Sequence, residues 1–258
     1  MSLFSTDLSI VWPALVAGIL VVISHVPLGQ QVFSRGIVFI DLAIAQVAGL
    51  GVIVASGFGL PIDGWPAQAA AGIAALAGAL LLTWTEKKRP EAQEALIGIL
   101  FVLASAMQIL LLANDPHGGE NLKDLLSGQI LWVSNAQLIR TAILTAVFDV
   151  IWFTARERIG RIGFYLLFAV VVTASVQMVG VYLVFTSLIV PAVATYRIAG
   201  KRQLAVGYGL GVASYVAGLA LSVVTDLPSS AVIVWTMALL GLFVHLCING
   251  KPMPVRQG

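Results

Sequence analysis

The sequence consists largely of apolar segments, each about as long as a membrane is thick. A helix needs roughly 20 residues to cross a hydrocarbon core about 30 Å thick. Hydrophobic residues make up 59% of the chain and charged residues only 10%, so a water-soluble fold could not cover its apolar surface. We therefore predict one all-α domain over residues 1–258, a polytopic membrane helix bundle, which excludes soluble enzymes and nucleic-acid-binding proteins. The segments fall at 9–27, 37–57, 67–85, 95–113, 136–154, 204–224 and 230–248.

A further apolar stretch, 163–196, is too long for a single span. Every Lys and Arg except Lys123 and Arg140 lies in alternate gaps between the spans, and the positive-inside rule assigns those gaps to the cytoplasm. Both flanks of 163–196 are basic, so this stretch must cross twice or enter and return, with a break near Gln177 and Gly180. We predict about nine spans, two of them short in this region, with the N-terminus outside and the C-terminus inside.

Two further features concern processing and packing. The first residues carry no basic segment, so we expect the first apolar run to be a retained span and not a cleaved signal peptide. Small residues recur four apart on the eighth span, which predicts close approach of a neighbouring helix. They are Gly207, Gly211, Ser214, Gly218 and Ser222.

Polar side chains within the spans are candidates for function, because a charge at the bilayer centre costs roughly 2.5–3.5 kcal/mol. His25 lies near the predicted cytoplasmic end of the first span and Asp41 near the start of the second. The two could face each other and hold a cation, move a proton, or only lock the hairpin. Gln46 lies deeper, either as a hydrogen-bonding partner between helices or as a ligand.

Other intramembrane polar residues have simpler interpretations. Asp149 is expected to reach toward Arg156 or Arg158 at the interface. Gln108 and Gln177 are expected to serve packing or to pair with the backbone, and His245 to be an isolated interior or interfacial histidine of the last span.

The outer segment 114–135 carries a possible metal site. On a helix, His117, Glu120 and Asp124 would share one face because their spacings are three and four. An imidazole and two carboxylates could attract Zn²⁺ or Mn²⁺. The alternative is a solvated amphipathic helix without a ligand.

Several short runs, taken in order, resemble the zinc/manganese ABC transporter permeases, the ABC-3 family. The resemblance covers nearly the whole chain and indicates a divergent branch. The runs are Pro27-Leu28-Gly29 with Arg35–Phe39 as a first loop, Glu94–Ile99 at the start of the fourth span, Asp124–Ser134 in the outer loop, Val179–Val184 through Leu188–Ala192 in two broken spans, and Asp226–Ser230 in the last outer turn.

This resemblance implies a multi-pass permease of the cell inner (plasma) membrane, without a cofactor of its own, that carries a divalent metal. It implies a homodimer or heterodimer of permeases, a separate cytoplasmic ABC ATPase and an extracytoplasmic metal-binding protein. The sequence agrees independently on one point. It contains no G-x-x-x-x-G-K-[ST] phosphate loop, so ATP hydrolysis must reside on a partner.

The first departure from the family concerns the proposed metal ligands of the second span. The family usually has Asp and His four residues apart there, and the aligned positions here are Leu42 and Gln46. The acid is one place earlier, at Asp41. Five residues correspond to about 140° around a helix of 3.6 residues per turn, so Asp41 and Gln46 cannot easily bind one ion from a single helix. His25 is the candidate for the missing imidazole.

The second departure lies between the fifth and sixth spans. The family has a longer cytoplasmic segment there that presses on the ATPase, whereas this chain has only residues 154–161. Two functions remain open. One is an ATP-driven importer working by alternating access, in which metal passes His117, Glu120 and Asp124, then Gln46, then His25 and Asp41. The other is an uncoupled descendant acting as a channel, sensor or assembly partner. No paired catalytic carboxylates support an intramembrane enzyme.

Overall fold

The computed structural model describes the chain except residues 1, 61–63, 114, 116–117, 156–157 and 250–258. The described residues form helices joined by short connections and contain no strand, which confirms the predicted all-α bundle. The α-helices are α1 (Ser2–Arg35), α2 (Ile40–Gly57), α3 (Trp65–Lys88), α4 (Gln93–Leu112), α5 (Gly118–Ser127), α6 (Asn135–Ala155), α7 (Gly160–Val179), α8 (Val181–Thr195), α9 (Lys201–Thr225) and α10 (Ser229–Asn249), with 3₁₀ turns η1 (Pro90–Ala92) and η2 (Ile130–Trp132).

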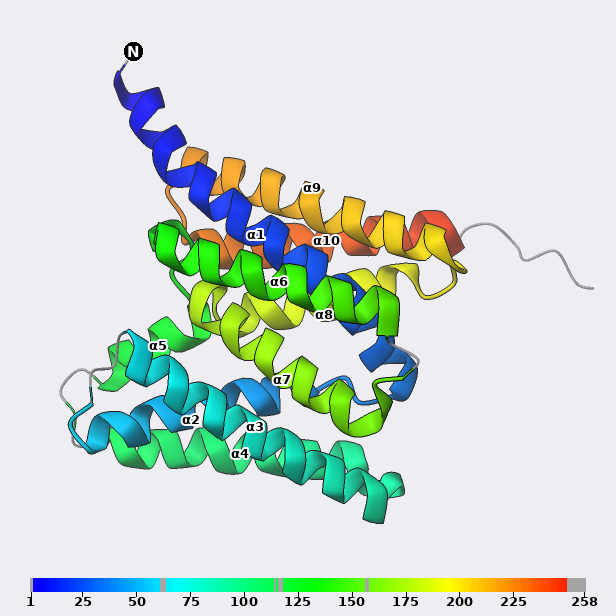
Figure 1. The fold of residues 1–258 in the computed structure, drawn as a ribbon. Helices are drawn as coiled ribbons and strands as arrows, with labels where there is room; N and C mark the ends of the chain where they lie inside the picture. The colour runs from blue at the N-terminus through cyan, green and yellow to red at the C-terminus, as the bar shows by residue number, and fades with distance from the viewer. Residues whose placement is uncertain (1, 61–63, 114, 116–117, 156–157, 250–258) are drawn as a thin grey trace, which may run out of the picture.

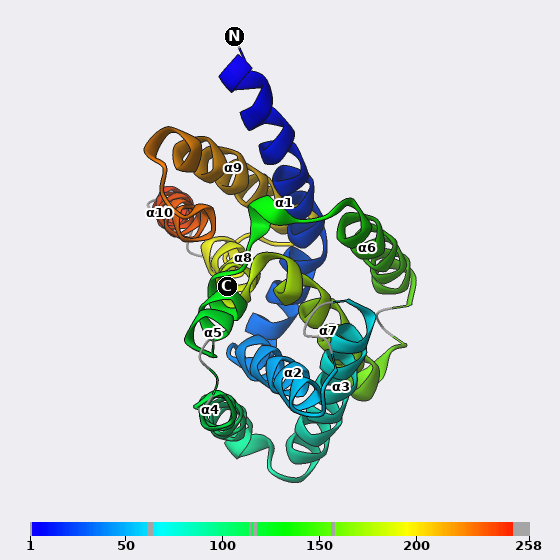
Figure 2. The same cartoon turned by 90° about the vertical axis from the view of Figure 1, so that its left-hand side faces the viewer.

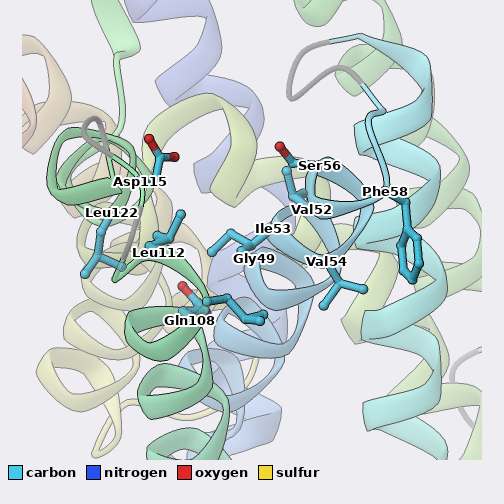
Figure 3. Close-up of a pocket in the computed structure, with 12 residues that line it drawn as sticks. Gly49, Val52, Ile53, Val54, Ser56, Phe58, Gln108, Leu112, Asp115 and Leu122 are labelled. Atoms are coloured by element: carbon cyan, nitrogen blue, oxygen red, sulfur yellow. The ribbon is translucent and has the colours of Figure 1, made fainter.

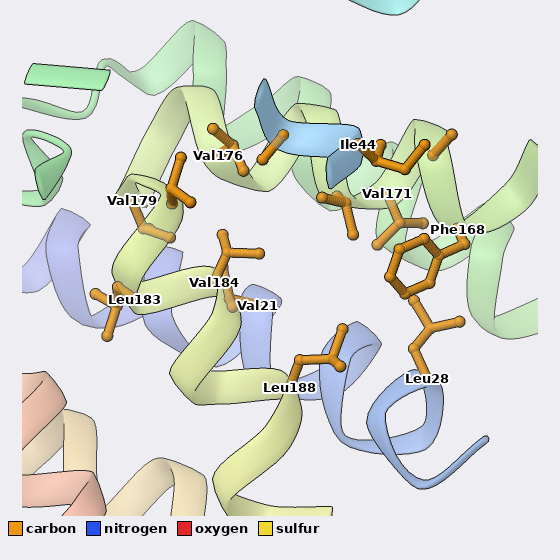
Figure 4. Packing of buried hydrophobic residues seen from close by; sticks show 14 of the residues in the cluster. Val21, Leu28, Ile44, Phe168, Val171, Val176, Val179, Leu183, Val184 and Leu188 are labelled. Carbon is orange, nitrogen blue, oxygen red and sulfur yellow. The ribbon is translucent and has the colours of Figure 1, made fainter. Parts of the chain in front are cut away.

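The helices fall into two groups joined by a central pair. Helices α2, α3 and α4 pack together on one side, and α1, α9 and α10 on the other, while α7 and α8 lie between them (Figures 1 and 2). Apolar side chains of both groups pack against α7 and α8. Leu28 of α1, Ile44 of α2, Phe168 of α7 and Leu188 of α8 belong to one buried cluster (Figure 4).

The two ends of the bundle differ in charge. The N-terminal end of α1 and helix α5 lie at one end, and the α3–α4 and α8–α9 connections lie at the other (Figure 1). The second end carries Lys87, Lys88, Arg197 and Lys201, so it is the end that the positive-inside rule predicts to be cytoplasmic.

Eight helices in the described part are long and apolar enough to cross a membrane, and α8 is a shorter apolar helix. The division of 163–196 into two helices is therefore confirmed, but only α8 is short. Helix α7 has 20 residues because it begins at Gly160 and includes Arg161 in its first turn. An arginine at this position can extend its charged end toward water while its stem lies along the apolar surface.

The break between α7 and α8 is at Gly180, as expected. Gly180 has a φ of 84°, a conformation that favours glycine, and the amide of Gly180 still donates to the carbonyl of Val176 at 2.8 Å. The end of α5, at Ser127, and the following Gly128 pack against the backbone at this break. A Cβ added to Gly180 would collide with the backbone of Ser127 and Gly128, so two glycines permit the contact.

Helix α1 is longer than the predicted first span. The run Pro27-Leu28-Gly29 was expected to be a loop after a span ending at 27, and this is wrong, because α1 continues without interruption to Arg35. Gly29 explains why the helix persists past Pro27. A Cβ there would collide with the carbonyl of Leu188, so glycine lets the backbones of α1 and α8 touch, and this packing offsets the hydrogen bond that proline removes.

The small residues of α9 pack as predicted. Gly207 and Gly211 lie against Val26 and Val22 of α1, and Gly218 lies against Ile233 of α10. The ladder therefore joins α9 to two helices and does not mark a ligand site.

Candidate functional site

Asp41 lies in the first turn of α2, in the part of the bundle predicted to be near the cytoplasm. Asp41 is 1% exposed, and no side chain or backbone group among the described residues lies within hydrogen-bonding geometry of either carboxylate oxygen. The turn before it is held on two sides. The ring of Phe39 stacks on Phe185 of α8 at 6.2 Å between centroids, and the amide of Phe39 donates to Oε1 of Glu94 at 3.4 Å. Asp41 thus has a buried carboxyl group with no side-chain partner among the described residues, and only the backbone amides at the start of α2 lie close to it.

His25 lies on α1 and is fully buried. Its Nδ1 is 2.9 Å from the carbonyl oxygen of Val21 and 3.0 Å from Oγ of Ser24, while Nε2 has no partner among the described residues. If Nδ1 carries the proton and donates to Val21, Nε2 presents a lone pair. Histidine metal ligands typically have this arrangement, with one ring nitrogen fixed by a backbone carbonyl and the other free to bind.

The structure does not bring His25 and Asp41 into contact. No hydrogen bond or ion pair between them occurs in the described part of the chain, and α1 packs mainly on α8, α9 and α6 whereas α2 packs mainly on α3 and α4. The expected depth of His25 is also wrong. Because α1 ends at Arg35, His25 lies ten residues, or about 15 Å, from that end of the helix.

Gln46 pairs with Gln108 across the α2–α4 interface. Nε2 of Gln108 donates to the carbonyl oxygen of Gln46 at 2.7 Å and to its Oε1 at 2.8 Å, and both residues are buried. Oε1 of Gln108 has no partner among the described residues. The expectation that Gln108 packs or pairs with the backbone is confirmed, because it hydrogen-bonds both the backbone and the side chain of Gln46.

A cavity of about 460 Å³ lies next to Gln108, between α2, α4 and α5. Its walls are mostly apolar, with Val52, Ile53 and Leu112 among them (Figure 3). Figure 3 also shows Ser56 and Asp115 toward one end and Gln108 toward the other. The cavity therefore extends from the outer end of α2 to the Gln46–Gln108 pair.

The outer candidate site is not described by the structure. Residues 118–127 form α5, as the spacing predicts, but His117 and the side chains of Glu120 and Asp124 lie outside the described part. Their joint role remains a prediction. Among described residues, no group of three His, Cys, Asp or Glu is close enough to hold a metal ion.

A polar network that the sequence did not predict joins α3, α4 and α7 at the predicted cytoplasmic end. Gln93 donates from Nε2 to the carbonyl of Leu82 at 3.0 Å and to the hydroxyl of Tyr165 at 3.2 Å. Nε of Arg161 is 3.4 Å from Oε2 of Glu86. Five charged or amide residues in this region, at 86–89 and 93, resemble an ordinary solvated turn in sequence, so only the fold reveals that Glu86 and Gln93 face the interior.

The remaining intramembrane residues differ in their surroundings, and Oδ1 of Asp149 is buried without a hydrogen-bond partner among the described residues. Asp149 forms no ion pair with Arg158, and Arg156 lies outside the described residues; the nearby polar group is Tyr208, which interacts electrostatically with Asp149. The hydroxyl of Tyr208 donates to the carbonyl of Ile23 at 3.3 Å. His245 is not isolated, because its ring stacks on Tyr196 at 6.0 Å between centroids.

The connection between α6 and α7 is as short as the sequence predicts. Helix α6 ends at Ala155 and α7 begins at Gly160, and the amides of Arg158 and Ile159 both donate to the carbonyl of Ala155. A separate helix cannot fit within this connection.

Comparison with known protein families decides the identity of this bundle. The model of the ABC 3 transport family matches residues 7–160 and 156–248. The chain belongs to the ABC 3 transport family. It is accordingly a multi-pass permease of the inner membrane and a transport subunit. The two matched segments overlap at residues 156–160, within the short connection between α6 and the start of α7.

Individual relatives agree with this assignment. The permease is 28% identical over 242 residues to the manganese transport system membrane protein MntC of Halalkalibacterium halodurans, covering 86% of this chain and 81% of that protein. It is 24% identical over 240 residues to a probable iron transport system membrane protein of Haemophilus influenzae, covering 85% and 83%. Its fold matches PsaBC from Streptococcus pneumoniae in complex with Fab with a TM-score of 0.75, at 22% identity and 94% coverage of both chains.

Proposed function

We propose that this permease is the membrane subunit of an ATP-driven importer for a divalent metal ion, manganese or zinc, that works by alternating access. The observation that carries the proposal is the family match over residues 7–248. Relatives whose names state manganese or iron transport are similar over more than four fifths of their length, which supports a metal as the transported substrate.

The interior of the bundle offers donors for such a substrate. The carboxylate of Asp41 and Nε2 of His25 are buried without hydrogen-bond partners among the described residues, and an ion in transit would satisfy both. They lie on different helices and form no contact, so each would meet the ion at a different step. A transport site must also release its ion, so a small ligand number at each step is sufficient.

The types of donor favour manganese over zinc. Asp41 and the amides of Gln46 and Gln108 supply oxygen atoms, and only His25 supplies an imidazole. Carboxylate and carbonyl oxygens suit Mn²⁺, whereas structural zinc sites are built mainly from Cys and His. The proposed outer residues His117, Glu120 and Asp124 would contribute two further carboxylates at the entrance.

The proposal requires partners. Because the chain has no phosphate-binding loop of its own, an ABC ATPase must supply the energy. An extracytoplasmic metal-binding protein would deliver the ion to the end of the bundle that carries α5, and a second permease would complete a homodimer or heterodimer.

Metal content of cells tests the proposal. Cells lacking the gene are complemented with the wild-type permease, with Asp41→Asn, or with Asp226→Asn, which removes an acid from the exposed outer turn after α9. Manganese measured by mass spectrometry should fall with Asp41→Asn at equal protein level and stay at the wild-type level with Asp226→Asn. Normal manganese in the Asp41→Asn cells would remove Asp41 from the mechanism.

A second function is favoured by one observation, the four residues that separate α6 from α7. Without room for a coupling helix there, the permease would act as a channel, sensor or assembly partner without an ATPase. Purification through a tag on the permease distinguishes the two functions. An ATPase that co-purifies in a fixed ratio supports the importer, and its absence under several mild detergents supports the uncoupled protein.

A further inference from the structure

A cavity of about 590 Å³ lies on the side of the bundle where the end of α3 meets the start of α7. It is separate from His25, Asp41 and the Gln46–Gln108 pair. Helix α3 contributes Trp84 and Lys87 to its lining, and α7 contributes Gly160, Arg161 and Ile162. Its position places it at the membrane surface that is predicted to be cytoplasmic.

The cavity is apolar on one side and positive on the other. Leu80 and Ile162 are about half exposed although they lie in membrane-crossing helices, so their side chains face lipid. Lys87 lies seven residues after Leu80, which is about 10 Å further along α3. This separation corresponds to the distance between a lipid headgroup and the first part of its acyl chains, so one lipid molecule can contact both sides.

The positive charge of the cavity is only partly balanced within the described residues. Arg161 uses Nε to pair with Glu86, whose side chain is 16% exposed and therefore lies on the inner side of α3. This pair orients the guanidinium group, and its terminal nitrogens form no bond with the described residues. Lys87 has no ion pair in the described part, and none of the lining residues is acidic.

An aromatic ring and a glycine complete a headgroup site. Nζ of Lys88 lies 5.0 Å from the centre of the Trp84 ring, which holds a third positive charge beside the cavity. Tryptophan at this level of a membrane protein typically lies among the headgroups. Gly160 lines the cavity and leaves it open there, since an added Cβ would meet nothing within 4 Å.

We propose that this cavity binds an anionic phospholipid of the cytoplasmic leaflet, with its phosphate on Lys87, Arg161 and Lys88 and its acyl chains along Leu80 and Ile162. Basic pockets between membrane helices on this side of the membrane are recognised sites for anionic headgroups. Ile159, which directly precedes α7, also lines the cavity. The lipid would hold α3 and α7 together at the end of the bundle where an ATPase would act.

Native mass spectrometry of the full-length permease tests the site. The permease is purified in detergent with phosphatidylglycerol and phosphatidylcholine of identical acyl chains, and bound lipids are counted at increasing lipid concentration. One phosphatidylglycerol should be retained in preference to phosphatidylcholine. In the double variant Lys87→Gln/Lys88→Gln, the affinity for phosphatidylglycerol should fall about 30-fold.

The matched control is Lys201→Gln/Arg202→Gln, which removes the same charge from the start of α9 at the same end of the bundle. It should retain phosphatidylglycerol like the wild type. Equal loss in the two double variants, or equal retention of phosphatidylcholine, would overturn the proposal. Competition with inorganic phosphate separates a lipid from a free anion, and displacement of phosphatidylglycerol by phosphate at similar concentration would also overturn it. The Lys87 and Lys88 side chains are exposed, so these variants are expected to fold.

Discussion

Gly128 and Gly180 touch backbone to backbone, although 52 positions separate them in the sequence. Both have positive φ values, 66° and 84°. A Cβ on either one would collide with the backbone of the other or of its neighbour. The outer segment that follows α5 is therefore fixed directly on the break between α7 and α8, at the end where a delivery protein would dock.

Gly180→Ala should be strongly destabilising, because it combines an unfavourable backbone conformation with a collision against the outer segment. Gly59→Ala is its matched control. Gly59 has a φ of 82°, but a Cβ there meets nothing within 4 Å. In this control, the free energy of unfolding should fall only by the cost of placing alanine in a left-handed backbone conformation, about 1–2 kcal/mol. Thermal unfolding of the two detergent-purified variants should show Gly180→Ala clearly less stable, and equal stability would disprove the contact.

Gly29→Ala should prevent normal packing of α1 on α8, because the added methyl group meets the Leu188 carbonyl, which cannot move without breaking α8. Gly98→Ala in α4 is the comparison, since a Cβ there has open space and should be neutral or stabilise by up to about 1 kcal/mol. Fluorescence-detected size-exclusion chromatography should show aggregation only for Gly29→Ala. A monodisperse peak for that variant would contradict the close approach.

The Gln46–Gln108 pair should behave as a coupled unit. Gln108→Leu removes the donor to Oε1 of Gln46 and leaves a buried acceptor, which costs about 1–3 kcal/mol. Gln46→Leu/Gln108→Leu removes both amide side chains and should recover part of this loss. A double-mutant cycle from thermal unfolding should give a coupling free energy of about 1 kcal/mol or more. Additive effects would show that the pair is not formed.

His25→Phe should reduce manganese accumulation by roughly tenfold, because it removes the free Nε2 while keeping an aromatic ring in the site. His245→Phe is the control, since His245 stacks on Tyr196 at the edge of the bundle and its ring is preserved. Accumulation is measured in cells with matched permease levels. If both variants accumulate manganese normally, His25 is structural.

The sequence predicted the features that depend on local patterns. Basic residues on both sides of 163–196 required a break, and the structure has it at Gly180. Spacing of small residues on α9 predicted close approach of a neighbouring helix, and the structure shows that the neighbours are α1 and α10. Hydrophobicity and the placement of charge decide these features without knowledge of the tertiary fold.

Other features depend on tertiary contacts that no local pattern contains. Pro27 and Gly29 resemble a helix end in sequence, but the packing of Leu188 keeps α1 continuous, so His25 lies deeper than predicted. The pairing of Gln46 with Gln108 and the inward orientation of Gln93 follow from how α2, α3, α4 and α7 meet. The sequence identified the candidate ligands as polar residues within the spans, but it did not predict which residues they contact.

The most direct measurement is manganese uptake into proteoliposomes that contain the permease with its co-purified ATPase. Uptake should require ATP on the side of the membrane where the ATPase is bound, and it should be faster for Mn²⁺ than for Zn²⁺. The Asp41→Asn variant should lose uptake while it still binds the ATPase. Manganese flux of equal size without ATP, with no ATPase bound to the permease, would contradict the account of a coupled importer.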